Sequence, residues 1–170
     1  MTAGYTVTWL EMTARPAIPR REMPRDGLSL VRARNPPVHY FRYLYDAVGS
    51  PYEWTDLHAW SDADIATYVR HEAMHLNVAH LDGCPAGFIL LDFREAPIAD
   101  IAYFGLVPEA VGRGLGSWLL LEGIHDAWDA GIEKLTVNTC TLDHPDALPL
   151  YRRMGFAPVR SEQREREVSA

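Results

Sequence analysis

The sequence predicts a single domain of the α/β (α+β) class over residues 1–170, with helices flanking a central sheet. Its length and its hydrophobic content of 48% suit one domain with a sizeable core. Segments with the two-residue alternation of strands and segments with helical periodicity follow one another along the chain. Because no internal repeat or low-complexity segment interrupts this order, we place no domain boundary.

The expected elements alternate between strands and helices. In chain order they are a strand at 5–12, its extension at 28–32, helices at 38–48 and 61–70, a hairpin of strands at 74–81 and 87–93, a strand at 99–107, a helix at 115–130, a strand at 135–139, a helix at 147–154 and a strand at 156–160. The tail at 162–167 alternates in charge and is expected to be a solvated edge or a frayed end.

Periodicity and capping residues predict the elements of the first half. Residues 5–12 alternate as a strand does, and a connection rich in Pro and Arg leads away from them. Four residues recur at helical spacing, namely Val38, Phe41, Tyr45 and Val48. Gly49 stands where that helix is expected to stop. Ser61 followed by Asp64 resembles a capping box, so a second helix is expected after a loop at 51–60.

Turn residues predict the elements of the second half. Asp82-Gly83 between two apolar runs is typical of a β-hairpin. Gly131 is the expected cap of the helix at 115–130, and β-branched residues predict the strand after it. Asp146 is expected to cap the next helix and Gly155 to end it.

Charge and cysteine content exclude several classes of partner. The chain has 16 Lys and Arg against 23 Asp and Glu, a formal charge of -7, which predicts no nucleic-acid partner. Cys84 and Cys140 lie far apart in sequence, so no disulfide framework is indicated. The N-terminus lacks a signal-peptide pattern and no run reaches the roughly 20 apolar residues of a membrane span. We therefore expect a cytoplasmic protein without a membrane partner.

A glycine loop follows the strand at 99–107, and we expect the chain to be organised around it. Gly112, Gly114 and Gly116 alternate there, so successive backbone N–H groups can approach a ligand closely. The N-terminus of the following helix adds partial positive charge, which favours an anion such as a phosphate over a simple turn. Ser117-Trp118 follows the third glycine, so the loop matches neither the Rossmann nor the P-loop pattern.

Two motifs carry a resemblance to a known family. The first is the glycine loop at 112–116 after a strand ending Leu-Val-Pro-Glu, and the second is Ala-Leu-Pro-Leu-Tyr-Arg-Arg-Met-Gly-Phe at 147–156. Over roughly residues 5–160 the chain resembles the GNAT superfamily of N-acetyltransferases. That resemblance implies a mostly antiparallel mixed sheet splayed at the acyl-CoA site, with acetyl-CoA as donor co-substrate and no metal. Val111 and His144 depart from the pattern, where the family usually has Gln or Arg and often has Asn.

The resemblance also implies the catalytic and donor-binding residues. Tyr151 is at the general-acid position, and a phenol with a pKa of about 10 can protonate a departing thiolate. Asp100 is where many members carry the acidic residue that removes the amine proton. The residues implied for coenzyme A are Leu106, Val107, Gly112, Arg113, Gly114, Leu115, Gly116 and Ser117. Asn138 is a further candidate, because at the end of the strand at 135–139 it can hydrogen-bond the cofactor or the acceptor.

The resemblance places the acceptor pocket at the aromatic first helix and the loop after it. The candidate substrate contacts there are Tyr40, Tyr43 and Trp54, although aromatic stripes at helical spacing are more often core. Tyr103, near Asp100 on the strand at 99–107, is a further candidate. We expect an N-acetyltransferase whose acceptor is the amine of an unidentified small molecule. Homodimers are the commonest assembly of soluble proteins, which makes a homodimer the default expectation.

A competing motif lies at 71–75, where His-Glu-Ala-Met-His matches the H-E-x-x-H of zinc peptidases. That motif needs a helix and a third ligand, whereas these residues are expected to straddle a helix end and a strand. A zinc metallopeptidase and an acyl-CoA-binding module without transfer chemistry are the alternatives. Stoichiometric zinc would favour the first, and a failure to release thiol when amines are offered would favour the second.

Overall fold

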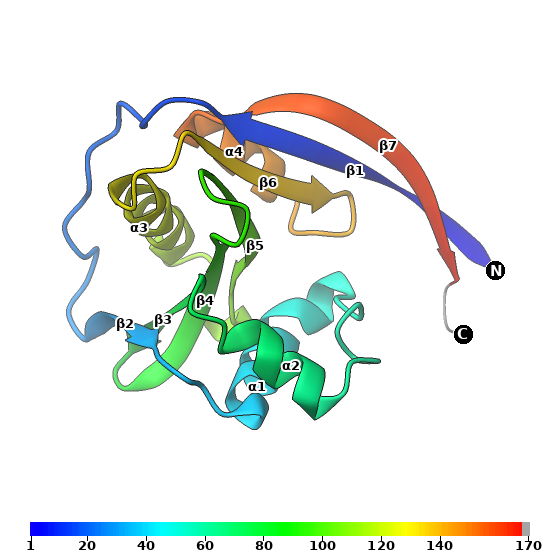
Figure 1. Ribbon diagram of the computed structural model, residues 1–170, viewed down its shortest axis with the longest axis horizontal. Coiled ribbons are helices and arrows are strands. Elements are labelled where there is room, and N and C mark those ends of the chain that lie inside the picture. The colour runs from blue at the N-terminus through cyan, green and yellow to red at the C-terminus, as the bar shows by residue number, and fades with distance from the viewer. Residues whose placement is uncertain (168–170) are drawn as a thin grey trace.

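Seven strands form one mixed sheet in the computed structural model, which describes residues 1–167 (Figure 1). The strands are β1 (Thr2–Met12), β2 (Leu28–Ala33), β3 (Met74–Leu81), β4 (Cys84–Asp92), β5 (Ile98–Leu106), β6 (Lys134–Cys140) and β7 (Ala157–Glu167). The helices are α1 (Val38–Gly49), α2 (Asp62–Val69), α3 (Leu115–Asp129) and α4 (Ala147–Met154), with 3₁₀ turns at Ser50–Tyr52 and Pro108–Ala110. The predicted α/β class is confirmed.

The strand order is β2-β3-β4-β5-β6-β1-β7, with β5 and β6 parallel and every other neighbouring pair antiparallel. The expectation that residues 28–32 extend the first strand is wrong, because β2 lies at one edge of the sheet while β1 lies between β6 and β7. The connection between β1 and β2 therefore crosses the width of the sheet (Figure 1).

Ion pairs hold this connection against α3. The guanidinium of Arg20 lies 2.6 Å from Glu122 Oε2, 2.7 Å from Asp126 Oδ1 and 2.9 Å from Asp129 Oδ2. Desolvation disfavours the charged guanidinium, but the hydrogen bonds and charges of these carboxylates together raise the pKa of Arg20 above its ordinary value. Because the pairs are partly exposed, each contributes modestly to stability. They fasten the connection between β1 and β2 to the surface of α3.

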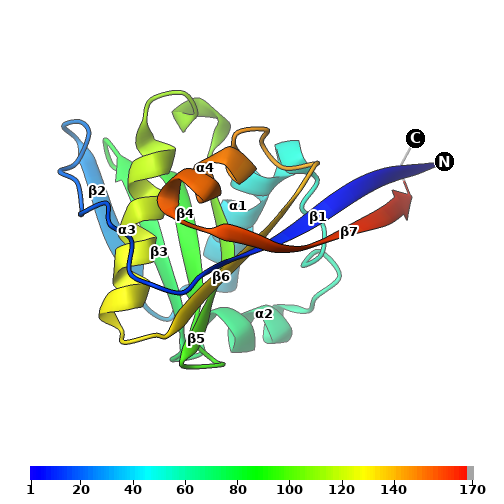
Figure 2. The same cartoon turned by 90° about the horizontal axis from the view of Figure 1, so that it is seen from above.

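The helices cover both faces of the sheet, with α1 and α2 on one face and α3 on the other (Figures 1 and 2). A Cβ on Gly123 would lie 2.3 Å from Ile89 Cδ1, so the absence of a side chain lets α3 approach β4 closely. On the opposite face, a Cβ on Gly105 would lie 2.4 Å from Val48 Cγ1, which brings α1 equally close to β5. The core lies in these two layers.

Most capping and turn predictions are confirmed. Ser61 Oγ accepts a hydrogen bond of 3.1 Å from Asp64 N at the start of α2, and the Asp82-Gly83 turn joins β3 to β4. Asp146 is the N-cap of α4, but its side chain makes no capping hydrogen bond. The tail at 162–167 belongs to β7, an edge strand, so the solvated-edge alternative is the right one.

The sheet opens between β5 and β6. The two strands pair from Ile98 with Lys134 to Ile101 with Val137 and then part, although both continue. Ala102 is an extra residue opposite β4, because Leu90 pairs with Tyr103 and Leu91 with Ile101. Such a bulge bends a strand and changes its twist, so it accompanies the splay that the family resemblance implied.

Beyond β6, β1 and β7 continue as a two-stranded ribbon (Figures 1 and 2). Residues Thr2–Thr6 pair with β7 alone, from Glu167 to Gln163. Trp9 lies under two guanidinium groups of the ribbon, with Arg160 Cζ 3.8 Å and Arg164 Cζ 5.3 Å from its ring centroid. We found no helix within residues 1–167 with the length and apolar character needed to cross a bilayer.

Candidate active site

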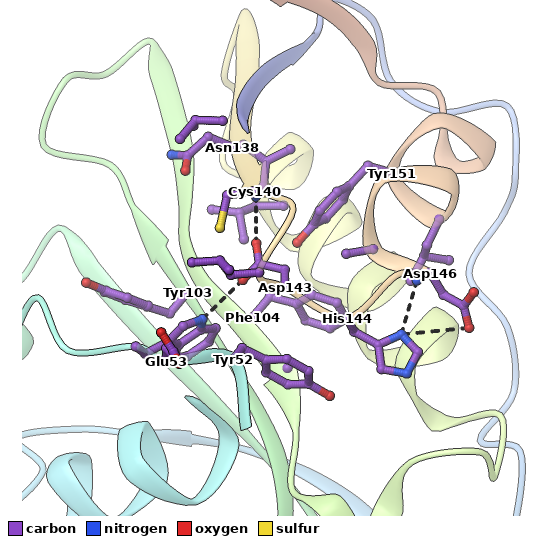
Figure 3. A pocket seen from close by; sticks show the side chains of 18 of the residues that line it. Tyr52, Glu53, Tyr103, Phe104, Asn138, Cys140, Asp143, His144, Asp146 and Tyr151 are labelled. Carbon is purple, nitrogen blue, oxygen red and sulfur yellow. Dashed lines mark hydrogen bonds and ion pairs between the residues drawn. The ribbon is translucent and has the colours of Figure 1, made fainter. Parts of the chain in front are cut away.

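A cavity of about 830 Å³ opens where β5 and β6 part (Figure 3). One part of it, which we call the donor half after the coenzyme A residues predicted there, is bounded by the glycine loop and the start of α3. The other part, which we call the acceptor half after the predicted substrate contacts Trp54 and Tyr103, is bounded by the loop at 52–56, the loop after β6 and the β1–β7 ribbon. Tyr151 of α4 lines the same cavity.

The donor half is built largely from main chain. Gly112 and Gly114 have φ of +79° and +76°, a conformation that only glycine adopts without strain, and a Cβ on either would meet nothing within 4 Å. Gly114 is the N-cap of α3 and supplies no side-chain cap. The first N–H groups of α3 therefore lack a capping side chain, while Gly116 and Ser117 line the cavity. These donors and the positive end of the helix fit an anion such as a pyrophosphate.

Tyr151 projects from α4 toward the side of the cavity where Cys140 and Asp143 lie (Figure 3). Only 5% of the residue is exposed, and its ring packs edge-on against Phe104 and Phe156. Within residues 1–167 its hydroxyl makes no hydrogen bond with a protein group. Burial raises the pKa of Tyr151 above its ordinary value, and the negative charges of Asp143 and Asp100 add to that rise. The phenol therefore stays protonated at neutral pH, as a proton donor must.

An aromatic and acidic wall bounds the acceptor half. Trp54 and Tyr103 have ring centroids 5.2 Å apart, and both line the cavity with Asp56. The hydroxyls of Tyr45 and Tyr103 both donate to the Asp56 carboxylate. Burial, and then the hydrogen bond to Asp56, raise the pKa of each of these tyrosines above its ordinary value. Both phenols therefore remain donors at neutral pH.

Asp143 ties the loop after β6 to the loop after α1. Its Oδ2 accepts hydrogen bonds from Thr139 Oγ1 at 2.7 Å and from Cys140 N at 2.9 Å, while Oδ1 accepts from Trp54 Nε1 at 3.3 Å (Figure 3). All three donors are uncharged. The carboxylate is thereby fixed at the cavity wall between the two loops.

The ribbon is fastened to the same loop. Arg166 Nη1 donates to the carbonyl oxygen of Glu53 at 3.0 Å and lies 3.0 Å from Glu53 Oε2, while Nη2 donates to Thr55 Oγ1 at 3.2 Å. Arg164, which also lines the cavity, pairs with Glu162 at 2.9 Å. Both arginines are thus matched by glutamates.

The structure brings together about half of the residues predicted for the site. Those that line the cavity are Trp54, Tyr103, Leu106, Gly112, Gly116, Ser117, Asn138 and Tyr151. Those outside its lining are Tyr40, Tyr43, Asp100, Val107, Arg113, Gly114 and Leu115. Gly114 belongs to the loop as the cap of α3, whereas Val107 and Leu115 point into the core, with 7% and 1% exposed.

Helical geometry explains the placement of Tyr40 and Tyr43. The buried stripe of α1 holds Phe41, Leu44, Tyr45, Val48 and Gly49, so the neighbouring positions face elsewhere. Tyr43 is 53% exposed, and Tyr40 packs partly against the core. The α1 residue whose hydroxyl reaches the acceptor wall is Tyr45.

Asp100 lies where β5 and β6 are still paired, one residue before the two strands part. It pairs with Thr136 in the sheet and accepts a hydrogen bond of 2.6 Å from Thr136 Oγ1. Burial, with a smaller contribution from Asp92, raises the pKa of Asp100 despite the opposing effect of this hydrogen bond. The structure thus surrounds Asp100 with sheet and places it outside the cavity lining, and its role as a base stays a prediction.

The residues that sequence reasoning missed are Asp56 and Asp143. Asp56 lies in a loop without periodicity, and Asp143 is one of the two acidic residues between β6 and α4, so neither had a sequence signal. Their positions depend on partners that are distant in sequence.

The H-E-x-x-H residues do not share a helix. The last residue of α2 is Val69, and β3 begins at Met74, so His71 lies in the turn and His75 on the strand. His71 Nδ1 accepts a hydrogen bond of 3.0 Å from Ala73 N. Within residues 1–167 no group of three or more His, Cys, Asp or Glu side chains is arranged to hold a metal ion.

Comparison with curated proteins finds mycothiol acetyltransferases. The one from Nocardia farcinica is 34% identical over 66 residues, and the one from Thermomonospora curvata is 35% identical over 81 residues. These matches cover 39% and 48% of this chain but only 22% and 27% of the relatives. The matched segment therefore spans about a quarter of the length of these curated proteins.

Comparison with solved structures finds the same fold at low identity. A GCN5-related N-acetyltransferase from Sphaerobacter thermophilus has a TM-score of 0.70 and 18% identity, over 95% of this chain and 51% of that one. An aminoglycoside acetyltransferase from an uncultured soil metagenomic sample, in complex with sisomicin, has a TM-score of 0.61 and 18% identity, over 76% of this chain and 88% of that one.

The family itself is shown by the sequence profile of the Acetyltransferase (GNAT) family, which matches residues 41–156, more than half of the chain. The match runs from α1 through the glycine loop to the Gly-Phe that follows α4. The chain belongs to the GNAT acetyltransferase family.

Proposed function

We propose that this protein transfers an acetyl group from acetyl-CoA to the amine of a small acceptor. The observation that carries the proposal is one continuous cavity with a glycine nest at one end and the buried, protonated hydroxyl of Tyr151 on its wall. Such an arrangement suits a donor with a phosphate at one end and a reacting thioester at the other.

The glycine loop and the N-terminus of α3 would hold the pyrophosphate of the donor. Beyond Ile101 and Val137 the facing edges of β5 and β6 are no longer paired with each other, so their backbone groups are available to an extended ligand between them. Leu106 and Asn138, on the two separated strands, line this gap. Bound there, acetyl-CoA supplies an activated carbonyl carbon with a thiolate as leaving group.

The acceptor amine must reach the carbonyl carbon as the neutral base. Its nitrogen forms the new C–N bond, the C–S bond breaks, and Tyr151 Oη gives its proton to the sulfur. The proton lost by nitrogen leaves to water, from which the phenolate of Tyr151 recovers its own. Proton donation of this kind contributes about 10²–10⁴-fold to a rate.

The acceptor enters from the side of the loop at 52–56 and the β1–β7 ribbon. The lining of the cavity bears on its identity more than the mycothiol acetyltransferases do, because those matches span less than half of this chain. Cys84 and Cys140 are both free thiols, which suits the reducing cytoplasm.

The test combines binding and turnover. Acetyl-CoA should raise the Tm of the purified protein, because a ligand that binds only the folded state stabilises it by mass action. Free thiol should then be released only when an amine is added, and mass spectrometry should find the acetylated amine. A protein that binds acetyl-CoA but acetylates no member of a broad amine panel would instead be a binding module. One that acetyl-CoA does not stabilise would contradict the proposal outright.

A further inference from the structure

The acceptor half of the cavity carries negative charge that no protein cation matches. Asp56 and Asp143 both line the cavity, and within residues 1–167 neither forms an ion pair with Lys, Arg or His. All the hydrogen bonds that these carboxylates accept come from neutral groups, as described above. Of the three arginines that line the same cavity, Arg164 and Arg166 are each paired with a glutamate, whereas Arg153 of α4 forms no ion pair within residues 1–167.

Trp54 and Tyr103 link the two carboxylates through a chain of contacts. Asp143 accepts a hydrogen bond from the indole N–H, whereas Asp56 is bonded to Tyr103, whose ring packs 5.2 Å from that of Trp54. The wall between two unmatched negative charges is therefore aromatic. Aromatic faces attract ammonium groups as well as alkyl chains.

We propose that the acceptor is a diamine or a larger polyamine, whose second ammonium group binds at Asp56 while the reacting amine lies beside Asp143. This proposal rests on the function proposed above and names its substrate class. An acceptor with one carboxylate and one amine is disfavoured, because its anion would meet Asp56 or Asp143. A neutral monoamine would leave the charge of Asp56 unmatched.

The two carboxylates have different tasks in this arrangement. Asp56 is a specificity residue, because its charge-assisted hydrogen bond acts on a group that does not react. Asp143 lies on the side of the cavity toward which Tyr151 projects, and it favours the approach of the positively charged end that is to be acetylated. The hydrocarbon chain of the acceptor would lie along Trp54 and Tyr103.

The experiment compares amines that differ by a single ammonium group. Thiol release is measured with butylamine and with 1,4-diaminobutane, and then with longer and shorter members of both series. For the best diamine we expect kcat/KM at least about tenfold above that of its matched monoamine, which corresponds to about 1.4 kcal/mol. Values within threefold of each other for every chain length would overturn the proposal while leaving the acetyltransferase function intact.

Asp56→Asn tests the named residue. The amide keeps an acceptor oxygen for one tyrosine hydroxyl and offers its NH2 group to the other, but it has no charge, so the preference for the diamine should fall to near one. Asp46→Asn is the matched control, because Asp46 is a nearby exposed carboxylate paired with His58 at 2.8 Å and does not line this cavity. A preference that survives Asp56→Asn would exclude Asp56 as the binding group.

Calorimetric titration separates recognition from turnover. 1,4-Diaminobutane should bind the wild-type protein with acetyl-CoA absent, and more weakly after Asp56→Asn. If no amine is acetylated but the diamine still binds through Asp56, the proposed function fails and the cation site stands. If Asp56→Asn does not fold, the comparison of butylamine with 1,4-diaminobutane in the wild-type protein still decides the question.

Discussion

The donor half and the acceptor half of the cavity are built in opposite ways. The donor half comes from the consecutive stretch 106–117, in which a strand, glycines and a helix start present main-chain groups. The acceptor half comes from side chains distant in sequence, since Tyr103 and Asp56 are 47 positions apart and Trp54 and Asp143 are 89 apart. A main-chain site tolerates changes of side chain as long as its glycines remain. A side-chain site changes with any one of its members.

The largest effect should follow from a side chain in the glycine nest. Gly114→Glu places a Cβ at a φ of +76° and a negative charge where we propose that phosphate binds, so we expect acetyl-CoA to bind at least about 100-fold more weakly. The measurement is the rise in Tm with acetyl-CoA concentration. An unchanged rise would contradict the assignment of the donor half.

Gly83→Glu is the control for that change. Gly83 also has a positive φ, of +83°, and open space around its Cβ position, but it lies in the β3–β4 turn outside the cavity. The backbone strain and the added charge are the same, so Gly83→Glu should lower the Tm of the free protein without reducing the shift that acetyl-CoA produces.

An intermediate effect should follow at Tyr151, where the two halves meet. Tyr151→Phe removes the proton donor and keeps the packing against Phe104 and Phe156, so kcat should fall by about 10²-fold while acetyl-CoA affinity stays the same. The loss belongs to the chemical step and is measured by single-turnover thiol release. Tyr68→Phe, on α2 outside the cavity, should leave kcat unaltered. An equal kcat for Tyr151→Phe and the wild type would remove Tyr151 from the proposed role.

The smallest effect should follow at Asp100, which belongs to neither half. Its pKa is raised in the folded state, so its contribution to stability is complete below the unfolded pKa and is lost as pH rises through the folded pKa. Asp100→Asn keeps an acceptor for Thr136 and cannot ionise. The Tm of the variant minus that of the wild type should therefore increase as pH rises from 4 to 7. A gain of about 2–4 °C corresponds to about 1 kcal/mol in a domain of this size.

Activity measurements on the same variant decide its catalytic role. We expect kcat of Asp100→Asn to stay well above that of Tyr151→Phe, because Asp100 does not line the cavity. A loss as large as that of Tyr151→Phe would restore the sequence-based prediction that Asp100 removes the amine proton.

Local patterns predicted most of the elements because their causes are local. The Ser61 cap, the Asp82-Gly83 turn and Gly155 after α4 each act on adjacent backbone, and each lies where it was expected. The position of β2 was predicted wrongly, because strand order depends on where the connection at 13–27 runs. Along that course it makes contacts such as that of Arg20 with Glu122, which join residues 102 positions apart.

The sequence by itself determined the family resemblance, the position of the glycine loop before α3 and the position of Tyr151 on α4. These features depend on residues that are consecutive in the chain, as main-chain motifs and helix caps do. The tertiary structure alone decided which side chains face the acceptor. It turned Tyr45 rather than Tyr40 or Tyr43 toward Asp56, and it fixed Asp143 between Trp54 and the end of β6. The physical reason is that the charge and shape of a pocket depend on contacts between distant segments, which no local pattern records.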